Sequence, residues 1–281
     1  MAIYTTKEAY SLKPSFNPQT EYIDVSTNLL HCKKCGHPLQ RKIHLGAEVL
    51  TVRCACSCQI TAYEEQERAR AHHQFLNAVE QNRFVALPSP TQHTHTFQTS
   101  ANINASQLSI AAAFVEHWDE HLQAGNGLLL WGGCGVGKTY LAECIANALV
   151  DRGIKVCMRS SPEVLTRLTD FKAGSSLDYL ESLDRFPLLI LDDFGAEWRT
   201  DFAKAQLFNL IDRRYRSRRP LIITTNLHLT QLQHPANPDQ ERIFTRILEM
   251  CMPLLISGAY PRDTFIATTA EQAKKLRNTW G

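Results

Sequence analysis

Residues 132–139 read Gly132-Gly133-Cys134-Gly135-Val136-Gly137-Lys138-Thr139, between the apolar run GLLLW (127–131) and the run TYLAECIANALVDRG (139–153). The spacing G-x-x-x-x-G-K-[ST], after a strand-like run and before a helix-like run, is typical of a phosphate-binding loop. Glycines let successive backbone N–H groups turn toward one phosphate, and the following helix N-terminus adds a favourable dipole. We expect a nucleotide here, with Lys138 on its β and γ oxygens and Thr139 on Mg²⁺.

Short apolar runs and amphipathic segments alternate around this loop. Strands are expected at 127–131, 154–159, 187–192 and 220–225, and helices at 111–123, 139–153, 162–169 and 204–215. Such alternation favours a parallel sheet covered by helices. The predicted fold class is therefore α/β, a P-loop sheet flanked by helices.

Polar side chains follow two of the expected strands. The run FPLLILDDFGAE (186–197) ends in Asp192 and Asp193, the position of a Walker B element. Asp192 is expected to support Mg²⁺ through water, and Asp193 to polarise the attacking water. Glu197 is a further candidate nearby. The run PLIITTN (220–226) ends in Thr225 and Asn226, and a polar side chain there could contact the γ-phosphate or its water.

Five of the nine cysteines fall between residues 32 and 58. Cys32 and Cys35 form a C-x-x-C-G knuckle, and the run VRCACSC (52–58) follows. Four thiolates make a tetrahedral Zn²⁺ site, which would be closed and structural. In a strand the second group would project on one face, so the sequence leaves open which two complete the site, or whether His44 replaces one. The candidate ligands are Cys32, Cys35, Cys54, Cys56 and Cys58. An iron–sulfur cluster and metal-free thiols are the alternatives.

The composition suggests two domains. A charged helix at 60–84 precedes LPSPTQHTHTFQTS (87–100), which has two prolines and no periodicity and is expected to be a linker. We predict a zinc-binding, partner-contact domain with a helical linker at 1–95 and an ATPase domain at 96–281. The net charge of +2 indicates no general attraction to nucleic acid. No apolar run is long enough for a membrane span, so we expect a cytoplasmic protein.

Five segments in order resemble the DnaC/DnaI helicase-loader and IstB family of AAA+ ATPases. They are GGCGVGKTYLA (132–142), LLILDDFGAE (188–197), IITTN (222–226), ERIFTRILE (241–249) and SGAYPR (257–262). The likeness covers about residues 97–270. It implies an arginine finger at Arg246, with Arg242 one helical turn earlier, and a sensor 2 arginine at Arg262, although Pro261 departs from the pattern. A finger requires self-association through the ATP interface.

Motifs and resemblance together define the candidate site residues. The catalytic set is Lys138, Asp193, Asn226 and Arg246. The nucleotide-binding set is Gly132, Gly133, Cys134, Gly135, Val136, Gly137, Lys138, Thr139, Tyr140, Asp192 and Arg262. Thr139 and Asp192 are the expected Mg²⁺ ligands.

The resemblance also implies a function. We expect an ATP-driven loader that assembles with a replicative helicase and single-stranded DNA, with ATP hydrolysis driving release. DNA would contact an extra helix within 159–176, where Arg167, Phe171 and Lys172 offer phosphate contacts and one aromatic face. The N-terminal zinc domain would contact the helicase. The alternatives are an IstB-like transposition helper and a zinc-dependent DNA-binding regulator without turnover. A run of arginines in IDRRYRSRRP (211–220) could face DNA or a neighbouring subunit, or simply be solvated.

Overall fold

The computed structural model describes residues 16–99, 103–169, 175–195 and 201–258. Contacts divide the chain into two compact units, residues 1–75 and 76–281. The boundary lies inside a helix, whereas the composition suggested a boundary near residue 95. In the described part of the chain, no helix combines the length and apolar character needed to span a bilayer.

The first unit contains two small antiparallel hairpins. Strand β1 (Glu21–Asp24) pairs with β2 (Leu29–Cys32), and β3 (Gln40–Leu45) pairs with β4 (Glu48–Arg53). Among residues 16–75, the described part of this unit, the buried apolar cluster contains only Leu30, Leu39, Cys32 and Cys56. Such a core is too small to stabilise a fold alone, so a cross-link or a bound ion is needed.

Helix α1 (Ser57–Ala86) begins in the first unit and ends in the second. Most of its residues are exposed, as expected from its charged sequence, and Val79 and Ala86 are its buried residues. Both belong to the core of the second unit. The last turns of α1 are therefore part of that unit.

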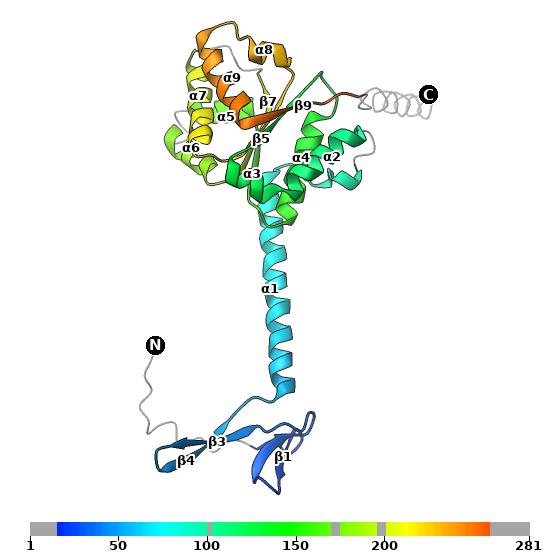
Figure 1. Ribbon diagram of the computed structural model, residues 1–281, viewed down its shortest axis with the longest axis vertical. Helices are drawn as coiled ribbons and strands as arrows, with labels where there is room; N and C mark the ends of the chain where they lie inside the picture. Colours follow the sequence, from blue (N-terminus) through cyan, green and yellow to red (C-terminus); the bar gives the residue numbers. More distant parts are fainter. Residues whose placement is uncertain (1–15, 100–102, 170–174, 196–200, 259–281) are drawn as a thin grey trace, which may run out of the picture. The chain divides into compact units, whose positions relative to one another are not determined.

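The second unit is built on a five-stranded parallel sheet with the order β6-β7-β8-β5-β9. The strands are β5 (Gly127–Trp131), β6 (Val156–Ser160), β7 (Leu188–Phe194), β8 (Leu221–Thr225) and β9 (Cys251–Leu255). Two apolar clusters pack against it, and Figure 1 shows helices on both of its faces. The predicted α/β class is confirmed. Strand β9 was not anticipated, because its residues follow α9 without a turn signal.

Helices connect these strands. They are α2 (Ala105–Glu116), α3 (Trp118–Ala124), α4 (Lys138–Asp151), α5 (Ser161–Thr169), α6 (Ser176–Asp184), α7 (Asp201–Arg216), α8 (Leu229–Gln233) and α9 (Pro238–Met250). The single helix expected at 111–123 is two helices. They break at His117, which is the C-cap of α2 and the N-cap of α3. Trp118, the first residue of α3, belongs to the core of the second unit, with 1% of its surface exposed.

The segment expected to be a linker is packed against α4 instead. We call residues 87–99 the connector; it contains the short 3₁₀ helices η1 (Pro90–Thr94) and η2 (Phe97–Thr99). Leu87 is fully buried, and the side-chain amide of Asn147 donates to the carbonyl oxygens of Gln92 and His95, each at 2.8 Å. The connector is therefore an ordered segment and not a flexible linker, because its carbonyl groups are paired and Leu87 is buried.

The arginine run near 211–220 is largely structural. Arg214 is completely buried and donates to the carbonyl oxygens of Phe186, Pro187 and Pro220. Arg213 pairs with Asp184, and Arg216 pairs with Asp212. The guanidinium of Arg214 therefore ties the starts of β7 and β8 together and is not available to DNA.

Candidate functional site

The predicted phosphate loop joins the end of β5 to the start of α4. A Cβ atom at Gly132 would lie 2.2 Å from the carbonyl oxygen of Ile256, so only glycine fits beside β9. Gly137, at φ +99°, caps the N-terminus of α4 in the left-handed region, which glycine occupies without strain. The N-terminus of α4 thus faces the loop, with its free N–H groups available to an anion.

Lys138 lies at the centre of this loop. Its ammonium donates to the carbonyl oxygens of Gly132 at 3.1 Å and Gly133 at 2.6 Å, and to Oδ1 of Asn226 at 2.6 Å. Burial lowers the pKa of Lys138, because it disfavours the charged ammonium. A negatively charged ligand such as phosphate would stabilise that charged form. The loop lysine and the polar residue after β8, expected in one site, are therefore in direct contact.

Thr139 and Asp192 also meet. The hydroxyl of Thr139 donates to Oδ1 of Asp192 at 2.9 Å, and the hydroxyl of Thr224 donates to the same oxygen at 2.6 Å. Burial raises the pKa of Asp192, although both hydroxyls oppose that shift. Hydroxyl and carboxylate oxygens are the ligands that Mg²⁺ prefers. Thr139 and Asp192 therefore fit a magnesium ion, which would neutralise phosphate charge when bound.

Asp193 takes a left-handed backbone conformation, with φ at +58°. Its backbone N–H donates to the hydroxyl of Thr224 at 3.0 Å, where the pairing of β7 with β8 is irregular. Aspartate tolerates this region better than most residues. Thr224 thus holds both acidic residues in place, one through its side chain and the other through its backbone. In the sequence, Thr224 is an inconspicuous residue inside the apolar run 220–225.

Thr225 has a structural position. Its buried hydroxyl donates to the carbonyl oxygen of Phe194 at 2.6 Å and accepts from the N–H of Leu227. Asn226, the next residue, is exposed and reaches Lys138. Of the two polar residues that end β8, only Asn226 therefore faces the loop.

A cavity of about 350 Å³ lies over these groups, and we call it the nucleotide cavity. Its lining comprises loop residues, Asp193, Asn226 and three residues from the connector and α4: His95, Cys134, Gly135, Gly137, Lys138, Thr139, Tyr140, Glu143, Asp193 and Asn226. His95 and Glu143 were missed in the sequence. The sequence offers one signal for this pair, because Glu143 places a carboxylate inside the apolar run of α4.

Four sulfur atoms gather in the first unit. Those of Cys32, Cys35, Cys56 and Cys58 all lie within 4.8 Å of one another. Cys32 Sγ is 3.6 Å and Cys56 Sγ is 3.2 Å from Cys58 Sγ. With Zn–S bonds near 2.3 Å, a tetrahedral site has sulfur separations of about 3.8 Å. The four cysteines therefore fit a zinc ion.

Local hydrogen bonds shift the pKa values of Cys35 and Cys58 in opposite directions. Backbone N–H groups of His37 and Cys58 lower the pKa of Cys35 to about 5, which favours its thiolate. The pKa of Cys58 is raised to about 12, first by its hydrogen bond to Cys56. A dication among the sulfurs would favour the thiolate of Cys58 as well.

Cys54 and His44 lie outside this group. Cys54 Sγ contacts the carbonyl oxygen of Pro38 at 3.6 Å, and His44 is exposed on β3. The assumption that the second cysteine group forms a strand was wrong. Strand β4 ends at Arg53 and α1 begins at Ser57, so the chain turns between Cys54 and Cys58.

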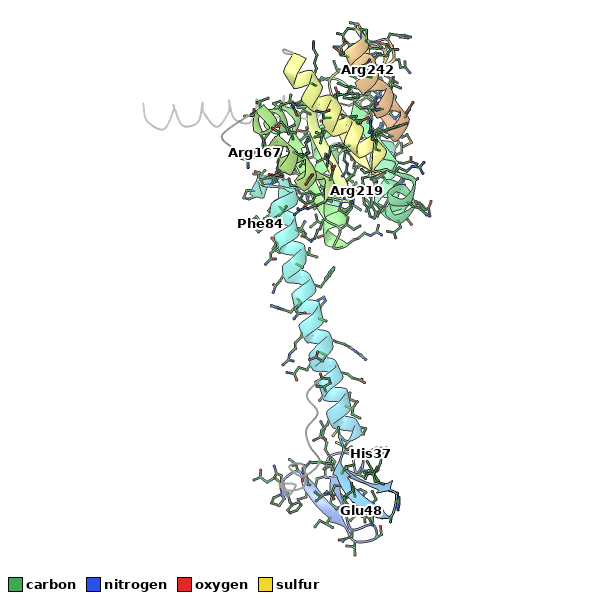
Figure 2. The ribbon with its side chains drawn as sticks, turned by 90° about the vertical axis from the view of Figure 1, so that its left-hand side faces the viewer. His37, Glu48, Phe84, Arg167, Arg219 and Arg242 are labelled. Atoms are coloured by element: carbon green, nitrogen blue, oxygen red, sulfur yellow. The ribbon has the colours of Figure 1, made fainter. Side chains whose placement is uncertain are left out.

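The two arginines of α9 differ in environment. Arg246 donates to Asp212 at 2.8 Å and lies over the ring of Phe208 at 4.7 Å, whereas Arg242 is exposed (Figure 2). Arg167, on α5, is exposed and lies 5.8 Å from the ring of Tyr179. Arg262, Phe171, Lys172 and Glu197 fall outside the described residues.

The sheet order places these motifs in one site. Strand β8 lies between β5 and β7, so its polar end stands between the phosphate loop and the acidic pair. A phosphate loop, an acidic strand end and a polar residue between them define an ATP-binding P-loop protein of the AAA+ class.

Sequence comparison identifies the group within that class. Residues 61–259 match the family described as IstB-like ATP binding protein (IstB_IS21). The chain belongs to this family.

Known relatives of the chain carry two kinds of name. The replicative helicase loader DnaI of Bacillus subtilis (strain 168) is 24% identical over 267 residues, covering 88% of this chain and 82% of the relative. A second relative, from Sinorhizobium fredii (strain NBRC 101917 / NGR234), is named insertion sequence ATP-binding protein y4iQ/y4nD/y4sD. It is 30% identical over 169 residues, which are 59% of this chain, and the match spans only 54% of that relative.

A solved structure supports the fold assignment. The crystal structure of the DnaC helicase loader superimposes with a TM-score of 0.54 and 27% identity, covering 60% of this chain and 100% of that one. Fold, site and family thus agree on an ATP-binding protein related to helicase loaders and insertion-sequence proteins.

Proposed function

We propose that this protein is an ATP-hydrolysing loader of a replicative helicase. The observation that carries the proposal is the extent of the likeness to DnaI. The alignment covers 88% of the chain, more than the second unit contains, so it includes residues of the cysteine unit. A loader needs both an ATPase unit and a separate partner-binding unit, and the likeness extends over both.

The nucleotide cavity supplies the groups for hydrolysis. Lys138 would bind the β and γ oxygens, Thr139 and Asp192 would hold Mg²⁺, and Asn226 would orient the γ-phosphate or its water. Asp193 lines the cavity beside Asn226 and is the proposed base for that water. Arg246 is the proposed finger, which would stabilise transition-state charge on a neighbouring subunit's nucleotide. Hydrolysis would then require self-association.

The cysteine unit is the proposed helicase contact. Its four clustered cysteines would hold Zn²⁺, which would supply the stability that its small apolar core cannot. Its hairpins expose Ile43, Leu45 and Val49, which are apolar surface available to a partner. Single-stranded DNA is the proposed ligand of the α5–α6 region, where Arg167 is exposed.

The test is co-purification of the full-length chain with the replicative helicase of its native cell, with ATP and Mg²⁺ present. We expect a complex that Cys56→Ser abolishes and Cys54→Ser retains, because Cys54 lies outside the sulfur cluster. ATP turnover rising with single-stranded DNA would support the same conclusion. A chain that binds ATP but never hydrolyses it, alone or with DNA, would instead be a zinc-dependent regulator.

The second candidate is an IstB-like transposition helper. It is favoured by the family match and by the Sinorhizobium relative. Such a protein would share the ATPase unit but act with a transposase on duplex DNA. Retention of a transposase in place of a helicase, together with stimulation by duplex DNA, would select this candidate.

A further inference from the structure

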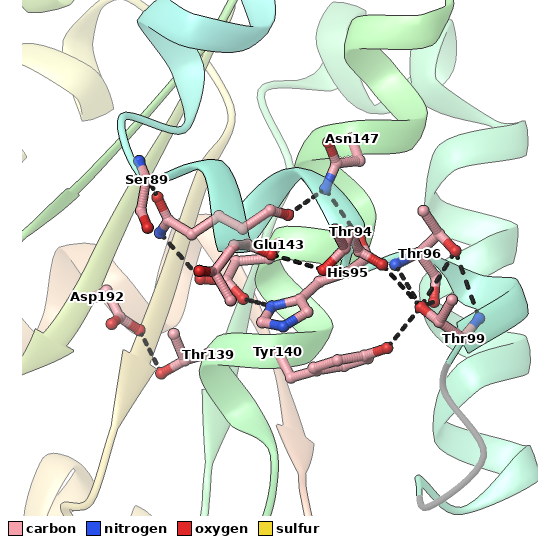
Figure 3. A network of polar contacts seen from close by, with 12 residues as sticks. Ser89, Thr94, His95, Thr96, Thr99, Thr139, Tyr140, Glu143, Asn147 and Asp192 are labelled. Atoms are coloured by element: carbon pink, nitrogen blue, oxygen red, sulfur yellow. Dashed lines mark hydrogen bonds and ion pairs between the residues drawn. The ribbon is translucent and has the colours of Figure 1, made fainter.

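The connector is attached to the face of α4 that borders the nucleotide cavity. Tyr140, Glu143 and Asn147 follow one another at helical spacing on α4, and each binds the connector (Figure 3). The hydroxyl groups of Tyr140 and Thr99 lie 2.8 Å apart. Asn147 is 1% exposed and bridges two connector carbonyls. The connector is thereby fixed as a wall of the cavity.

Glu143 is the buried charge in this wall, with 4% of its surface exposed. It accepts a hydrogen bond from Nε2 of Gln92 at 2.9 Å and pairs with Nδ1 of His95. A buried carboxylate is costly unless such partners satisfy it. An apolar residue at this position would let α4 pack without that cost. We therefore look for a role of the Glu143–His95 pair other than packing.

His95 is held in a defined orientation. Its ring packs on Tyr140 with centroids 4.4 Å apart, 26% of its side chain is exposed, and it lines the nucleotide cavity. A neutral imidazole that donates from Nδ1 has an unprotonated Nε2, which is an acceptor. Among the residues that the structure describes, no protein group is hydrogen-bonded to this Nε2.

The position of the base follows from that of the phosphates. The phosphate loop lies at the N-terminus of α4, and the nucleoside must continue from it through the same cavity. The wall beyond the loop is formed by Tyr140, Glu143 and His95. A base that continues from phosphates on the loop would lie against the ring of Tyr140 and the free acceptor of His95.

We propose that His95, held by Glu143 as a donor from Nδ1, reads the exocyclic amino group of adenine and thereby selects ATP over GTP. Adenine presents a donor at its six-position, which complements Nε2. Guanine presents a carbonyl oxygen there, so two acceptors would face each other. Leaving such a buried group unpaired lowers affinity by about tenfold or more. The inference rests on the proposed nucleotide site.

The decisive variant is Glu143→Gln. The glutamine oxygen still accepts from Gln92, while its amide group faces Nδ1 of His95 as a donor. Nδ1 must then accept, and the proton moves to Nε2, which becomes a donor suited to guanine. We expect the ratio of GTP to ATP dissociation constants to fall about tenfold, with tighter GTP binding. The readout is competition by ATP, GTP and ITP against a fluorescent ADP, using the full-length chain.

A second variant separates base reading from support of the fold. In His95→Asn the amide nitrogen replaces Nδ1 and still reaches Glu143, but the Nε2 acceptor is lost. We expect ATP to bind about tenfold more weakly and GTP, no longer opposed by the Nε2 acceptor, to bind no more weakly than to the unmodified chain. The matched control is His93→Asn. His93 lies in η1, which ends one residue before His95; it bonds to the carbonyl oxygen of Leu87 and does not line the cavity, so the ratio should not change.

Three outcomes would overturn the inference. Equal binding of ATP and GTP by the unmodified chain would do so while leaving the nucleotide site intact. Equal weakening of both nucleotides in Glu143→Gln would show that the pair only supports the fold. An unchanged ratio of GTP to ATP dissociation constants in both variants would show that other residues recognise the base. Failure of the nucleotide site itself is distinguishable, because the unmodified chain would then bind no nucleotide.

Discussion

Nε of Arg246 lies 2.8 Å from Oδ1 of Asp212, so α9 and α7 of one subunit hold the proposed finger between them. The guanidinium also donates to the carbonyl oxygen of Arg242 at 2.9 Å and stacks on Phe208. Only 25% of its side chain is exposed. As the proposed finger, Arg246 would exchange Asp212 for a neighbour's phosphate, and breaking this ion pair would then be a step in assembly.

Replacement of Arg246 is expected to separate binding from turnover. In Arg246→Ala the nucleotide cavity is untouched, so the dissociation constant for ATP should change by no more than about twofold. Turnover by the assembled protein should fall by about 10³-fold, the usual effect of losing an arginine finger. ATPase assays across protein concentrations, with equilibrium binding in parallel, measure both. Arg216→Ala is the control, because Arg216 pairs with the same Asp212. Weaker ATP binding in Arg246→Ala would contradict the assignment.

Release of the finger is expected in Asp212→Asn. The variant keeps the side-chain volume but removes the charge that holds Arg246. Partly exposed ion pairs contribute up to about 1 kcal/mol, so the protein concentration for half-maximal ATPase should fall by about two- to fivefold. A concentration series of steady-state rates measures the midpoint. An unchanged or higher midpoint would show that Asp212 does not restrain assembly.

Loss of the loop lysine is expected to have a different effect. Lys138→Ala removes the only ammonium that the described structure places in the nucleotide cavity, and the ATP dissociation constant should rise by at least about tenfold. Exposed Lys155, on the chain before β6, provides Lys155→Ala as the matched control. Titration with a fluorescent nucleotide measures both. Comparable losses in Lys138→Ala and Lys155→Ala would argue against the site.

Thr224 is expected to act as a positioning residue for the metal. In Thr224→Val the hydroxyl that holds Asp192 and the N–H of Asp193 is lost, with little change in volume. The Mg²⁺ concentration for half-maximal turnover should rise, and nucleotide binding without Mg²⁺ should stay the same. Thr224→Ser keeps the hydroxyl and should show the same Mg²⁺ dependence as the unmodified chain. A simple loss of stability would instead lower the unfolding temperature without shifting that dependence.

Metal content is expected to follow the sulfur cluster. The unmodified chain and Cys54→Ser should each contain one zinc per chain, and Cys56→Ser should contain far less. Because the cysteine unit has only four residues in its buried cluster, chelation should also unfold it. Elemental analysis and the protease sensitivity of the first unit provide the two measurements. Equal zinc loss in Cys54→Ser and Cys56→Ser would disprove the ligand choice.

The local motifs of the site could be predicted from the sequence because their chemistry lies in adjacent residues. The loop ending in Lys138 and Thr139, the acidic pair near the end of β7 and Asn226 after β8 lie together at one edge of the sheet, where Lys138 contacts Asn226 and Thr139 contacts Asp192. Parallel strands end at one edge of the sheet, which brings such motifs together. The helical cover of the sheet was also predictable, because apolar runs alternate with amphipathic segments along the sequence.

Contacts between distant segments could not be predicted. The connector has prolines and no periodicity, and its order depends on Glu143 and Asn147, about fifty residues later on α4. The restraint on Arg246 depends on Asp212 of another helix. The choice of Cys56 and Cys58 depended on where β4 ends and α1 begins, and element boundaries are the least reliable feature of a sequence prediction.

Helix α1 has a mechanical consequence for the ATPase. It is uninterrupted from Ser57 to Ala86, and near its end Arg83 donates to Asn147 at 2.6 Å and pairs with Asp151. Both partners belong to α4, whose first residue is Lys138. A change in the position of the last turn of α1 would therefore act, through side chains in direct contact, on the helix that begins with the loop lysine.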